Sequence, residues 1–443
     1  MTFVHSPPAL KLVDVLRDAP DFLDRADSSP EFEMAMRRAN ARYLHWDQFR
    51  HQPLPSGFSH EFSWAYLKFL RRSSLRAAPF ADKDDKPFAF SLPDEAQRVL
   101  SQIDRWAGDT LETGSGGPLP SRERYIVSSL MEEAIASSQL EGAVTTRVVA
   151  KEMLRSGRTP RDKSEQMIVN NWRSIQHLRR CQKQPLTPQL ICEIQALLTQ
   201  KTMQNEDEVG RFRTRDDVVV TWNERVVHQP PLAEKLAERM DALCRFANHD
   251  DDEPWVHPVV KAAMLHFWLA YDHPFADGNG RTARALVYWY LLSRGYWLFE
   301  YMAISRLFLK APAQYGRAYL YTETDEGDLT YFLMLNLRVV HLAFEELRSY
   351  IQRKNAEIAA AVQSLQSQSG LNSRQRQFLA HVVRRPDELF TVESYRKENN
   401  VVYQTARQDL LSLVEKGLLQ QRKSGKAFVF TAPPDLTQRL GQP

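Results

Sequence analysis

The segment His273–Arg284, HPFADGNGRTAR, places a histidine, a carboxylate, a glycine-rich turn and two arginines within twelve residues. The histidine suits proton transfer, and Asp277 suits a hard cation such as Mg²⁺. The backbone of Gly278–Gly280 can direct N–H groups toward an anion, while Arg281 and Arg284 offer forked donors to phosphate oxygens. This combination predicts a site that handles a nucleotide phosphate.

Two apolar stretches flank the segment and predict the helices that hold it. Residues Val256–Tyr271, VHPVVKAAMLHFWLAY, repeat apolar side chains at helical spacing and carry a proline near their start. Residues Thr282–Ser293, TARALVYWYLLS, do the same, and Gly295 stands where a helix would stop. Asn279–Arg281 should therefore lie at a helix N-terminus, where free N–H groups and the helix dipole favour an anion. The two arginines are three residues apart, so they share one face of that helix.

The segment resembles the Fic family signature, HPFx(D/E)GNGRxxR, at all nine specified positions: His273, Pro274, Phe275, Asp277, Gly278, Asn279, Gly280, Arg281 and Arg284. A glycine turn that merely connects two helices would leave the histidine, the carboxylate and the arginines unexplained. The resemblance implies a mainly α fold, with a helical catalytic core and a short β-hairpin flap. One neighbour departs from the family pattern. Asp272 stands where an apolar residue is common, and we expect its side chain to point to solvent.

The resemblance also implies a reaction, the transfer of AMP from ATP to a Ser, Thr or Tyr hydroxyl of a protein target or of the chain itself. His273 would be the general base, and Asp277 would hold Mg²⁺. The phosphates would be bound by Gly278, Asn279, Gly280, Arg281 and Arg284. ATP as substrate and Mg²⁺ as cofactor follow from these roles. Removal of AMP from a modified protein by the same centre is left open, because addition and removal use the same residues.

A second motif implies that the activity is held back. Around Ser137 the chain reads SSQLEGA, and Ser137, Glu141 and Gly142 fit the family's inhibitory pattern (S/T)xxxE(G/N). The resemblance implies that Glu141 pairs with Arg284 in the place of the γ-phosphate. A semi-buried carboxylate needs such a partner, and an arginine offers bidentate bonding. The alternative is an exposed glutamate at a helix end, which is its ordinary place in most proteins.

Further segments follow the family order. Val209–Arg213, VGRFR, resembles the element that precedes the family's flap, and β-branched runs within Val218–His228 predict a hairpin. The flap residues Val226, Val227, His228 and Gln229 would lie over the site and pair with an extended target segment. A hairpin without this role is the alternative. Tyr315 would border the adenine, although an aromatic residue at helical spacing also suits a core.

Composition sets limits on the class of protein. The chain has 443 residues, of which 43% are hydrophobic and 26% charged, as in soluble globular proteins of two or three domains. It contains no apolar run of the length of a membrane helix and no signal-peptide pattern at its start, so we expect a cytoplasmic protein without a membrane partner. Cys181, Cys192 and Cys244 are widely spaced, and we expect them to be buried and reduced.

Composition shifts suggest three regions. Residues 1–112 form a helical N-terminal region, residues 119–350 a Fic catalytic domain that includes the inhibitory helix, and residues 370–434 a small winged-helix-like domain. The breaks are TGSGGP at 113–118 and QSQSGLNS at 366–373. For the N-terminal region we expect packing against the catalytic core, with target recognition as the alternative.

The last region has the element order of a winged helix. Helices are predicted at Ser373–Arg384, Thr391–Asn399 and Tyr403–Lys416, followed by strands at Leu418–Arg422 and Ala427–Thr431. Residues 372–432 contain eleven Lys or Arg and six Asp or Glu, a balance of +5 in a chain whose net charge is only +3.

Basic and polar side chains on this third helix and wing are candidate DNA contacts: Arg407, Gln408, Arg422, Lys423 and Lys426. The alternative partner of the winged helix is a protein, including a second copy of the chain in a homodimer. A DNA-binding regulator with an ancillary Fic domain is therefore the competing class of function.

Overall fold

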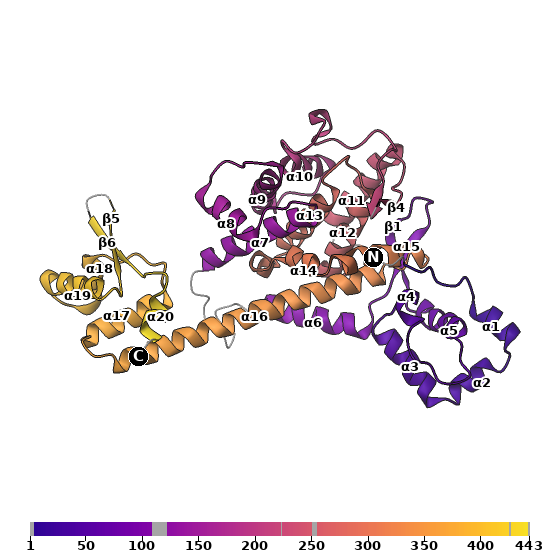
Figure 1. Cartoon of the computed structure of the whole chain (residues 1–443), viewed down its shortest axis with the longest axis horizontal. Coiled ribbons are helices and arrows are strands. Elements are labelled where there is room, and N and C mark those ends of the chain that lie inside the picture. Colours follow the sequence, from indigo (N-terminus) through magenta and orange to yellow (C-terminus); the bar gives the residue numbers. More distant parts are fainter. Residues whose placement is uncertain (1–3, 109–121, 223, 250–254, 425–426, 442–443) are drawn as a thin grey trace. The chain divides into compact units, whose positions relative to one another are not determined.

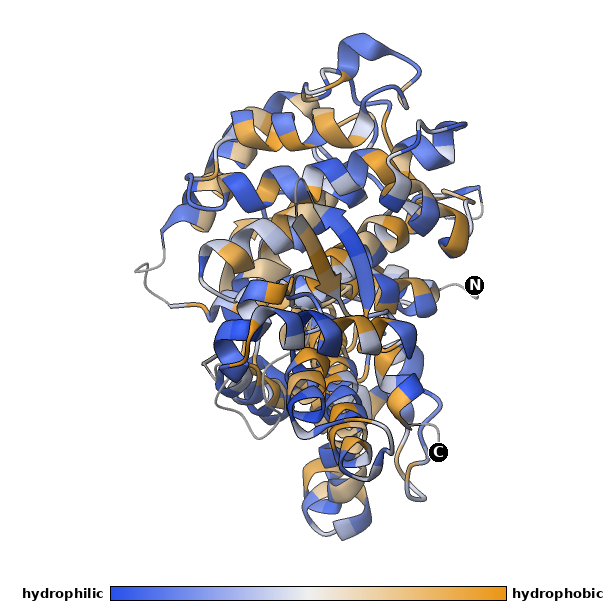
Figure 2. Ribbon diagram, turned by 90° about the vertical axis from the view of Figure 1, so that its left-hand side faces the viewer, coloured by the Kyte–Doolittle hydropathy of each residue, from blue (hydrophilic) through white to orange (hydrophobic). Residues whose placement is uncertain are grey.

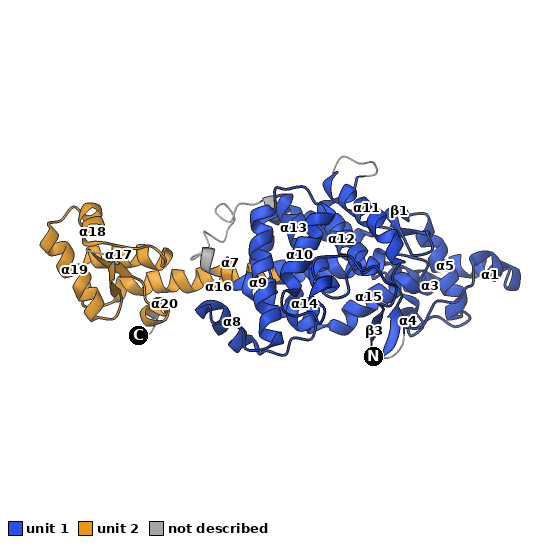
Figure 3. Cartoon of the chain, turned by 90° about the horizontal axis from the view of Figure 1, so that it is seen from above, with its two compact units in different colours: residues 1–107, 128–344 blue, residues 108–127, 345–443 orange. Residues whose placement is uncertain are grey.

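The computed structural model describes residues 4–108, 122–222, 224–249, 255–424 and 427–441. The chain forms two compact units, residues 1–107 with 128–344 and residues 108–127 with 345–443 (Figure 3). The predicted break at 113–118 lies outside the described residues. Among those that are described, no helix is both long enough and apolar enough to cross a membrane.

Helices dominate the first 344 residues, as the sequence predicts (Figure 1). The α-helices are α1 (Leu12–Asp18), α2 (Phe22–Asp27), α3 (Pro30–Ala41), α4 (Trp46–Phe49), α5 (His60–Arg72), α6 (Asp94–Gly108), α7 (Arg122–Leu140), α8 (Arg147–Ser156), α9 (Lys163–Cys181), α10 (Pro188–Thr199), α11 (Leu236–Asn248), α12 (Pro258–Asp272), α13 (Asn279–Ser293), α14 (Ile304–Lys310), α15 (Pro312–Thr324) and α16 (Thr330–Ser367). Short 3₁₀ helices are η1 (Glu206–Glu208), η2 (Ala233–Lys235) and η3 (Trp297–Tyr301).

Helices α12 and α13 form the centre of the first unit, and both were predicted from their apolar patterns. Nearly every side chain of α12 is buried, as expected for a helix that is apolar on all sides. Its first turn is capped by the ring of His257, which accepts a hydrogen bond from the N–H of Val259 at 3.1 Å, and Pro258 occupies the first helical position. Helix α13 ends at Ser293, just before Gly295.

Strands occur in three antiparallel hairpins. They are β1 (Arg76–Ala81) with β2 (Pro87–Phe90), β3 (Val220–Trp222) with β4 (Arg225–His228), and β5 (Gln420–Ser424) with β6 (Ala427–Thr431). The second and third hairpins were predicted. The first was not, because the sequence analysis treated residues 1–112 as helical only. The hairpin is a correction to that prediction.

The N-terminal region packs on the helical core, as expected. The ring of Phe80 in β1 stacks on Trp268 of α12 with centroids 4.6 Å apart. The hydroxyl of Tyr43 donates to the carboxylate of Asp328 at 2.7 Å, and Lys68 forms an ion pair with Asp325 at 2.9 Å. These contacts join residues that are more than 180 positions apart in the chain, so the first hundred residues stabilise the core around α12 and α16.

The second unit contains the predicted three helices and wing. Its elements after α16 are α17 (Ser373–Arg384), α18 (Val392–Asn399), α19 (Tyr403–Glu415), β5, β6 and α20 (Leu436–Gly441). These elements share a hydrophobic core that includes Phe378, Leu410 and Phe430. In Figure 2 strand β5 is coloured hydrophilic and strand β6 hydrophobic; in β6 the side chain of Phe430 is buried and that of Phe428 is exposed.

Candidate active site

The loop between α12 and α13 carries the predicted signature. His273 ends α12 with a positive φ of 45°, and its N–H donates to the carbonyl of Leu269 at 3.0 Å. Gly278 begins α13 with a φ of 87°. A Cβ atom on Gly278 would lie 2.7 Å from Cγ2 of Thr199, so glycine is required both for its backbone conformation and for space. The left-handed conformation of His273 is uncommon for a residue with a side chain and is typical of functional sites.

Side chains from the surrounding helices hold this loop rigidly. Asn279 accepts a hydrogen bond from the N–H of Phe275 at 2.9 Å and donates to the carbonyl of the same residue at 2.7 Å. Gln195 of α10 donates to the carbonyl of Asp277 at 2.9 Å and accepts from the N–H of Gly210 at 2.6 Å. Asn279 therefore holds the loop through both polar groups of its amide, a second role beside the expected contact with phosphate.

Arg213 fixes the other end of the loop. Its N–H donates to the carbonyl of Pro274 at 2.8 Å, and its guanidinium donates to the carbonyl of His273 at 3.0 Å. Asp216 accepts a further hydrogen bond from it at 3.1 Å. Arg213 ends the segment VGRFR, whose pattern predicted no role for it; in the structure it positions the backbone that carries His273.

The hydrogen bond of the His273 ring identifies its tautomer. Nδ1 lies 3.2 Å from the carbonyl of Ala270, which can only accept, so Nδ1 carries the proton. Nε2 is then the unprotonated nitrogen and can accept a proton. Burial lowers the pKa of His273 to about 4, so the ring is neutral near neutral pH. Both features suit a general base.

Asp272 corrects one expectation of the sequence analysis. It does not point to solvent, because its side chain is fully buried. Arg239 donates to its carboxylate at 2.8 Å, and the indole N–H of Trp268 donates to it at 3.0 Å. Burial raises the pKa of Asp272, and the charge of Arg239 opposes that rise. Arg239 also donates to the carbonyl of Ala81 at 2.7 Å, so the N-terminal hairpin is linked to the residue that precedes His273.

Arg284 and Glu141 form the expected ion pair. The guanidinium donates to the carboxylate of Glu141 at 2.9 Å, to the hydroxyl of Ser137 at 3.0 Å and to the carbonyl of Ser137 at 2.8 Å. Burial disfavours the charge of Arg284, but the neighbouring carboxylate outweighs it and holds the pKa of Arg284 above its usual value. The side chain of Arg284 is only 3% exposed, whereas that of Glu141 is 30% exposed.

Gly280 leaves the space that the carboxylate of Glu141 occupies. A Cβ atom at this position would lie 3.0 Å from Cδ of Glu141, would overlap its Oε1, and would lie 3.1 Å from Nη1 of Arg284. The backbone of Gly280 has no unusual conformation that would require glycine. The absence of a side chain at Gly280 is therefore what allows Glu141 to approach the first turn of α13.

The carboxylate of Asp277 is half exposed and fits a single protein ligand for Mg²⁺. It accepts from the N–H of Gly278 at 2.5 Å and from Arg281 at 3.3 Å, and 46% of its side chain remains exposed. Magnesium in nucleotide sites is commonly held by one or two carboxylates together with phosphates and water. Within the described part of the chain, no group of three or more histidine, cysteine or acidic side chains forms a metal site. A cation here would therefore depend on ligands from a nucleotide.

The side chain of Arg281 is more deeply buried than expected for an arginine that binds a phosphate freely from solvent. Its side chain is 1% exposed, and it donates to the carbonyl of Leu198 at 2.9 Å as well as to Asp277. Its Nε atom is buried without a hydrogen-bond partner. A buried N–H without an acceptor lowers the stability of a fold. The Nε–H of Arg281 therefore remains available as a hydrogen-bond donor to a ligand.

Tyr315 of α15 lies close to Arg284 and has partners within the protein. Its hydroxyl is 2.7 Å from Nε2 of His266 and 3.3 Å from the hydroxyl of Tyr319, and its ring stacks on Phe308 at 4.4 Å. Burial raises the pKa of Tyr315, and the neighbouring Arg284 opposes that rise. The position of Tyr315 beside an adenine stays a prediction.

The predicted flap is the hairpin β3–β4, which projects two large apolar side chains. Val226 is 59% exposed and Trp222 is 38% exposed. His228 anchors the hairpin, since its ring nitrogens lie 2.7 Å from the carbonyl of Tyr271 and 2.8 Å from the carboxylate of Glu323. Val227 and Gln229 are half-buried and exposed, respectively. The end of β4 is thus tied to Tyr271, which precedes His273 by two residues in the chain.

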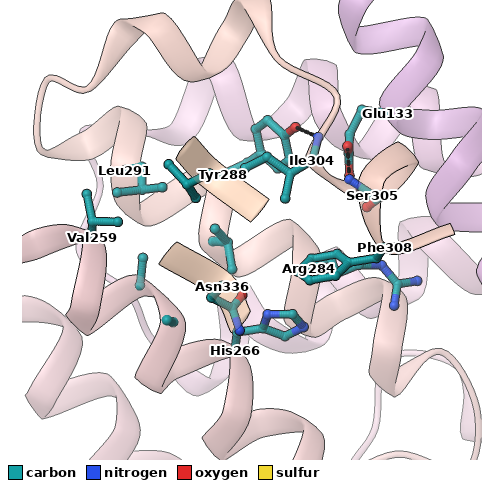
Figure 4. A pocket seen from close by; sticks show the side chains of 14 residues that line it. Glu133, Val259, His266, Arg284, Tyr288, Leu291, Ile304, Ser305, Phe308 and Asn336 are labelled. Atoms are coloured by element: carbon teal, nitrogen blue, oxygen red, sulfur yellow. Dashed lines mark hydrogen bonds between the residues drawn. The ribbon is translucent and has the colours of Figure 1, made fainter. Parts of the chain in front are cut away.

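Arg284 also lines a pocket between the helices of the first unit, together with Glu133, His266 and Phe308 (Figure 4). Its polar lining includes Glu133, whose carboxylate accepts from the N–H of Ser305 at 2.8 Å, and burial raises the pKa of Glu133. Glu133, Ser137 and Glu141 are four residues apart along α7 and the turn after it, so one face of this helix lies along Arg284. Glu133 was not predicted as a site residue, although it stands four residues before Ser137 in the sequence.

Comparison with known proteins agrees with this geometry. Residues 185–291 match the model of the Fic/DOC family. This segment is a Fic domain. The chain is 29% identical over 206 residues to the protein adenylyltransferase Fic of Nematostella vectensis, which covers 45% of this chain and 46% of that protein. It is 40% identical over 89 residues to the protein of the same name from Drosophila melanogaster, which covers 20% of this chain and 17% of that protein.

Solved structures share the fold. A Fic family protein from Desulfovibrio desulfuricans G20 has a TM-score of 0.50 at 18% identity, with 76% of this chain and 94% of that chain covered. A variant of Fic-1 from C. elegans has a TM-score of 0.50 at 16% identity, with 79% and 93% covered. The chain spans less than half the length of the curated relatives named above. This chain therefore shares the Fic domain and its fold with these proteins.

Proposed function

We propose that this chain is an autoinhibited protein adenylyltransferase, which transfers AMP from ATP to a Ser, Thr or Tyr hydroxyl of a target protein or of itself. The observation that carries the proposal is the state of His273. Its Nδ1 proton is held by the carbonyl of Ala270, its Nε2 is unprotonated, and it stands at the loop that leads into the N-terminus of α13. A base beside an anion-binding helix end is the arrangement that such a transfer needs.

In the proposed reaction Nε2 of His273 accepts the proton of the target hydroxyl. The hydroxyl oxygen forms a bond to the α-phosphorus of ATP, the bond from that phosphorus to the bridging oxygen breaks, and pyrophosphate leaves. The N–H groups of Gly278, Asn279 and Gly280 face the phosphates at the start of α13. Arg281 and Arg284 would neutralise the β- and γ-phosphates. Asp277 would hold Mg²⁺, which neutralises charge on the phosphates when it is bound.

The pair between Glu141 and Arg284 supports the inhibited state. The guanidinium that would bind the γ-phosphate is occupied by the carboxylate at 2.9 Å. Other partners of this arginine, the carbonyl and hydroxyl of Ser137 and the hydroxyl of Tyr315, can remain in place if the carboxylate leaves. Binding of ATP in a productive position therefore competes with one hydrogen-bonded carboxylate, and basal activity is low.

The hairpin β3–β4 is proposed to receive the target. Its strand β4 carries Val226, Val227 and His228 and is followed by Gln229, and a two-stranded hairpin has unpaired edges at which an extended segment can add. Tyr315 is proposed to border the adenine on the family resemblance alone, since its contact with Arg284 lies toward the phosphates. A homodimer is a further proposal.

A cytoplasmic location is also proposed. Cys181, Cys192 and Cys244 are free thiols in the described part of the chain, and burial raises the pKa of Cys192 to about 11. Un-ionised thiols that form no disulfide suit a reducing compartment.

The test is the intact mass of purified chain after incubation with ATP and Mg²⁺. We expect little change for the wild type, a gain equal to AMP for Glu141→Gly, and no gain when His273→Ala is added. Glu152→Ala is a matched control, because it removes an exposed carboxylate from α8 without touching Arg284. It should behave as the wild type.

The other outcomes exclude the proposal in separate ways. A gain equal to phosphate from Glu141→Gly would replace AMP transfer with kinase chemistry. If Glu141→Gly gained no mass but the wild type released AMP from a modified protein, removal of AMP would be the function. Equal gains in Glu141→Gly and Glu152→Ala would exclude the inhibitory role of the ion pair.

A further inference from the structure

The second unit contains a domain that the proposed reaction does not use. Helices α17, α18 and α19 are followed by the hairpin β5–β6, and Phe390 forms an isolated antiparallel bridge to β6 through hydrogen bonds with Phe430 at 3.0 and 2.8 Å. The domain has a hydrophobic core of its own, which includes Leu379, Tyr395 and Leu413. This arrangement is that of a winged helix, with α19 as the third helix and β5–β6 as the wing.

Helix α19 has one buried face and one exposed face. Ala406, Leu410 and Leu413 are fully buried, while the exposed side chains of its first turns are Tyr403, Gln404, Arg407 and Gln408. The exposed face of these turns carries no carboxylate.

The acidic residue of the same turns points inward. Asp409 is 7% exposed, and it accepts hydrogen bonds from Arg374 at 3.0 Å and from Tyr395 at 3.1 Å. The domain therefore neutralises this carboxylate internally. It leaves on the outer face glutamine and arginine, which can form paired hydrogen bonds with the edge of a base.

Some of the basic side chains described in this domain form ion pairs with carboxylates, and others do not. Arg396 pairs with Glu393 at 2.7 Å, and Arg439 pairs with Asp435 at 2.9 Å. In the described part of the domain, Arg407 of α19 and Arg422 and Lys423 of β5 form no ion pair, and all three are exposed. Their charges are therefore available to a partner. Lys426, the remaining candidate from the sequence, lies outside the described residues.

We propose that the outer face of α19 and strand β5 form a binding surface for duplex DNA. A single α-helix fits the major groove, where Arg407, Gln404 and Gln408 can reach base edges. Arg422 and Lys423 lie on the wing strand and contact phosphates, which contributes affinity without sequence selection. The surface is independent of the Fic domain, so this inference goes beyond the proposed reaction.

Charge favours DNA over a protein partner for this surface. Three exposed apolar side chains, Val402, Tyr403 and Phe428, lie on or beside it and could also meet a protein. The cores of protein interfaces, however, are depleted in charged residues, whereas DNA-binding surfaces are strongly positive. Three uncompensated cations, with no carboxylate on the exposed face of the first turns of α19, match a polyanion.

The full-length chain provides the test, with fluorescence anisotropy of a labelled mixed-sequence duplex. We expect the affinity of the wild type to fall steeply between about 50 and about 200 mM salt. Substitution of both wing cations, Arg422→Gln with Lys423→Gln, should weaken binding about 10-fold and reduce the slope of log affinity against log salt by about 2. Arg407→Gln should weaken binding and reduce discrimination between duplex sequences.

Lys416→Gln is the matched control at the other end of α19. The ammonium group of Lys416 lies 3.6 Å from the position that a Cβ atom of Gly370 would occupy, away from the helix's first turns. It should bind as the wild type does, and so should His273→Ala. Circular dichroism checks that each variant is folded.

No binding at low salt would overturn the proposal, as would an equal loss of affinity in Lys416→Gln. If the chain bound no DNA but formed a dimer that Phe428→Ser dissolved, the surface would belong to a second copy of the chain.

Discussion

Substitution of Gly280 by alanine tests whether the carboxylate of Glu141 occupies the first turn of α13. The new methyl group would overlap Oε1 of Glu141 and would lie 3.0 Å from its Cδ, so the carboxylate and the methyl group cannot share this space. The other close atom, Nη1 of Arg284 at 3.1 Å, is the far end of a flexible side chain. The methyl group should therefore expel the carboxylate and leave the arginine nearly in place.

The effect on stability should depend on residue 141. A hydrogen bond to a charged group contributes about 2 kcal/mol, a figure that suits a pair in which Arg284 keeps its bonds to Ser137 and Glu141 is partly exposed. Alanine in place of glycine inside a helix stabilises by up to about 1 kcal/mol. Gly280→Ala should thus destabilise the wild type by about 1 kcal/mol. In the Glu141→Gly background Gly280→Ala should be neutral or stabilising. Its effect on the unfolding free energy should therefore differ between the two backgrounds by up to about 2 kcal/mol, which is the coupling between positions 141 and 280.

The assay is urea unfolding of the four proteins of this double-mutant cycle, followed by tryptophan fluorescence. Ala283→Gly, in the next turn of α13, sets an upper limit on the helix-propensity contribution, because it also removes a buried methyl group. If alanine at position 280 changed the unfolding free energy by the same amount in both backgrounds, the carboxylate would not occupy this space, and the reasoning would be refuted.

Three further predictions follow from the buried polar groups. Arg239→Met leaves the buried carboxylate of Asp272 without its cation and should cost about 3–5 kcal/mol in thermal unfolding, of which Asp272→Asn should restore a part; no restoration would contradict the pairing. Asn279→Ala removes both hydrogen bonds to Phe275 and should lower AMP transfer in the Glu141→Gly background at least about 10-fold, while a smaller loss would show that the loop holds its shape without them. The pKa of His45 is lowered by burial to about 4, so the unfolded chain binds more protons than the folded one between pH 6.5 and 4, and stability falls as pH decreases through that window. His45→Phe should reduce the difference in unfolding free energy between pH 7 and pH 5 by about 2 kcal/mol, and an unchanged difference would exclude His45 as its source.

The helices could be predicted because their local signals agree with their burial. Helix α12 is apolar on all sides, begins at a proline and ends at His273, and α13 ends before Gly295. The winged-helix elements were predicted to within two residues, since each helix start carries a side-chain cap or a change of periodicity. Where local propensity and tertiary packing favour the same structure, the sequence is sufficient.

The hairpin β1–β2 could not be predicted because its stability is tertiary. Strand β1, RAAPFA, contains a proline and shows no alternation of apolar and polar residues. The strand is held by the stack of Phe80 on Trp268 and by the bonds from Arg239 to the carbonyls of Ala81 and Asp82. These partners are more than 150 residues away in the chain, and nothing in the local sequence specifies them.

Asp272 was placed wrongly for the same reason. A carboxylate next to an active-site loop is usually solvated, because burial of an unpaired charge is costly. Its partner Arg239 lies on α11, and no spacing rule connects the two positions. The residues of the signature could be predicted because they act within one segment of twelve residues, whereas the residues that support it, Arg213, Gln195 and Arg239, come from three other segments.

The partners of Arg284 decide how the inhibited state can be relieved. Two of its hydrogen bonds go to Ser137, whose side chain is 2% exposed and whose carbonyl belongs to the last turns of α7. The helix holds both of these acceptors in place. Another hydrogen bond of Arg284 goes to Glu141, which lies beyond the last residue of α7 and is partly exposed. A phosphate that approaches Arg284 therefore has to displace one side chain in the turn after α7, and it can do so while α7 stays packed.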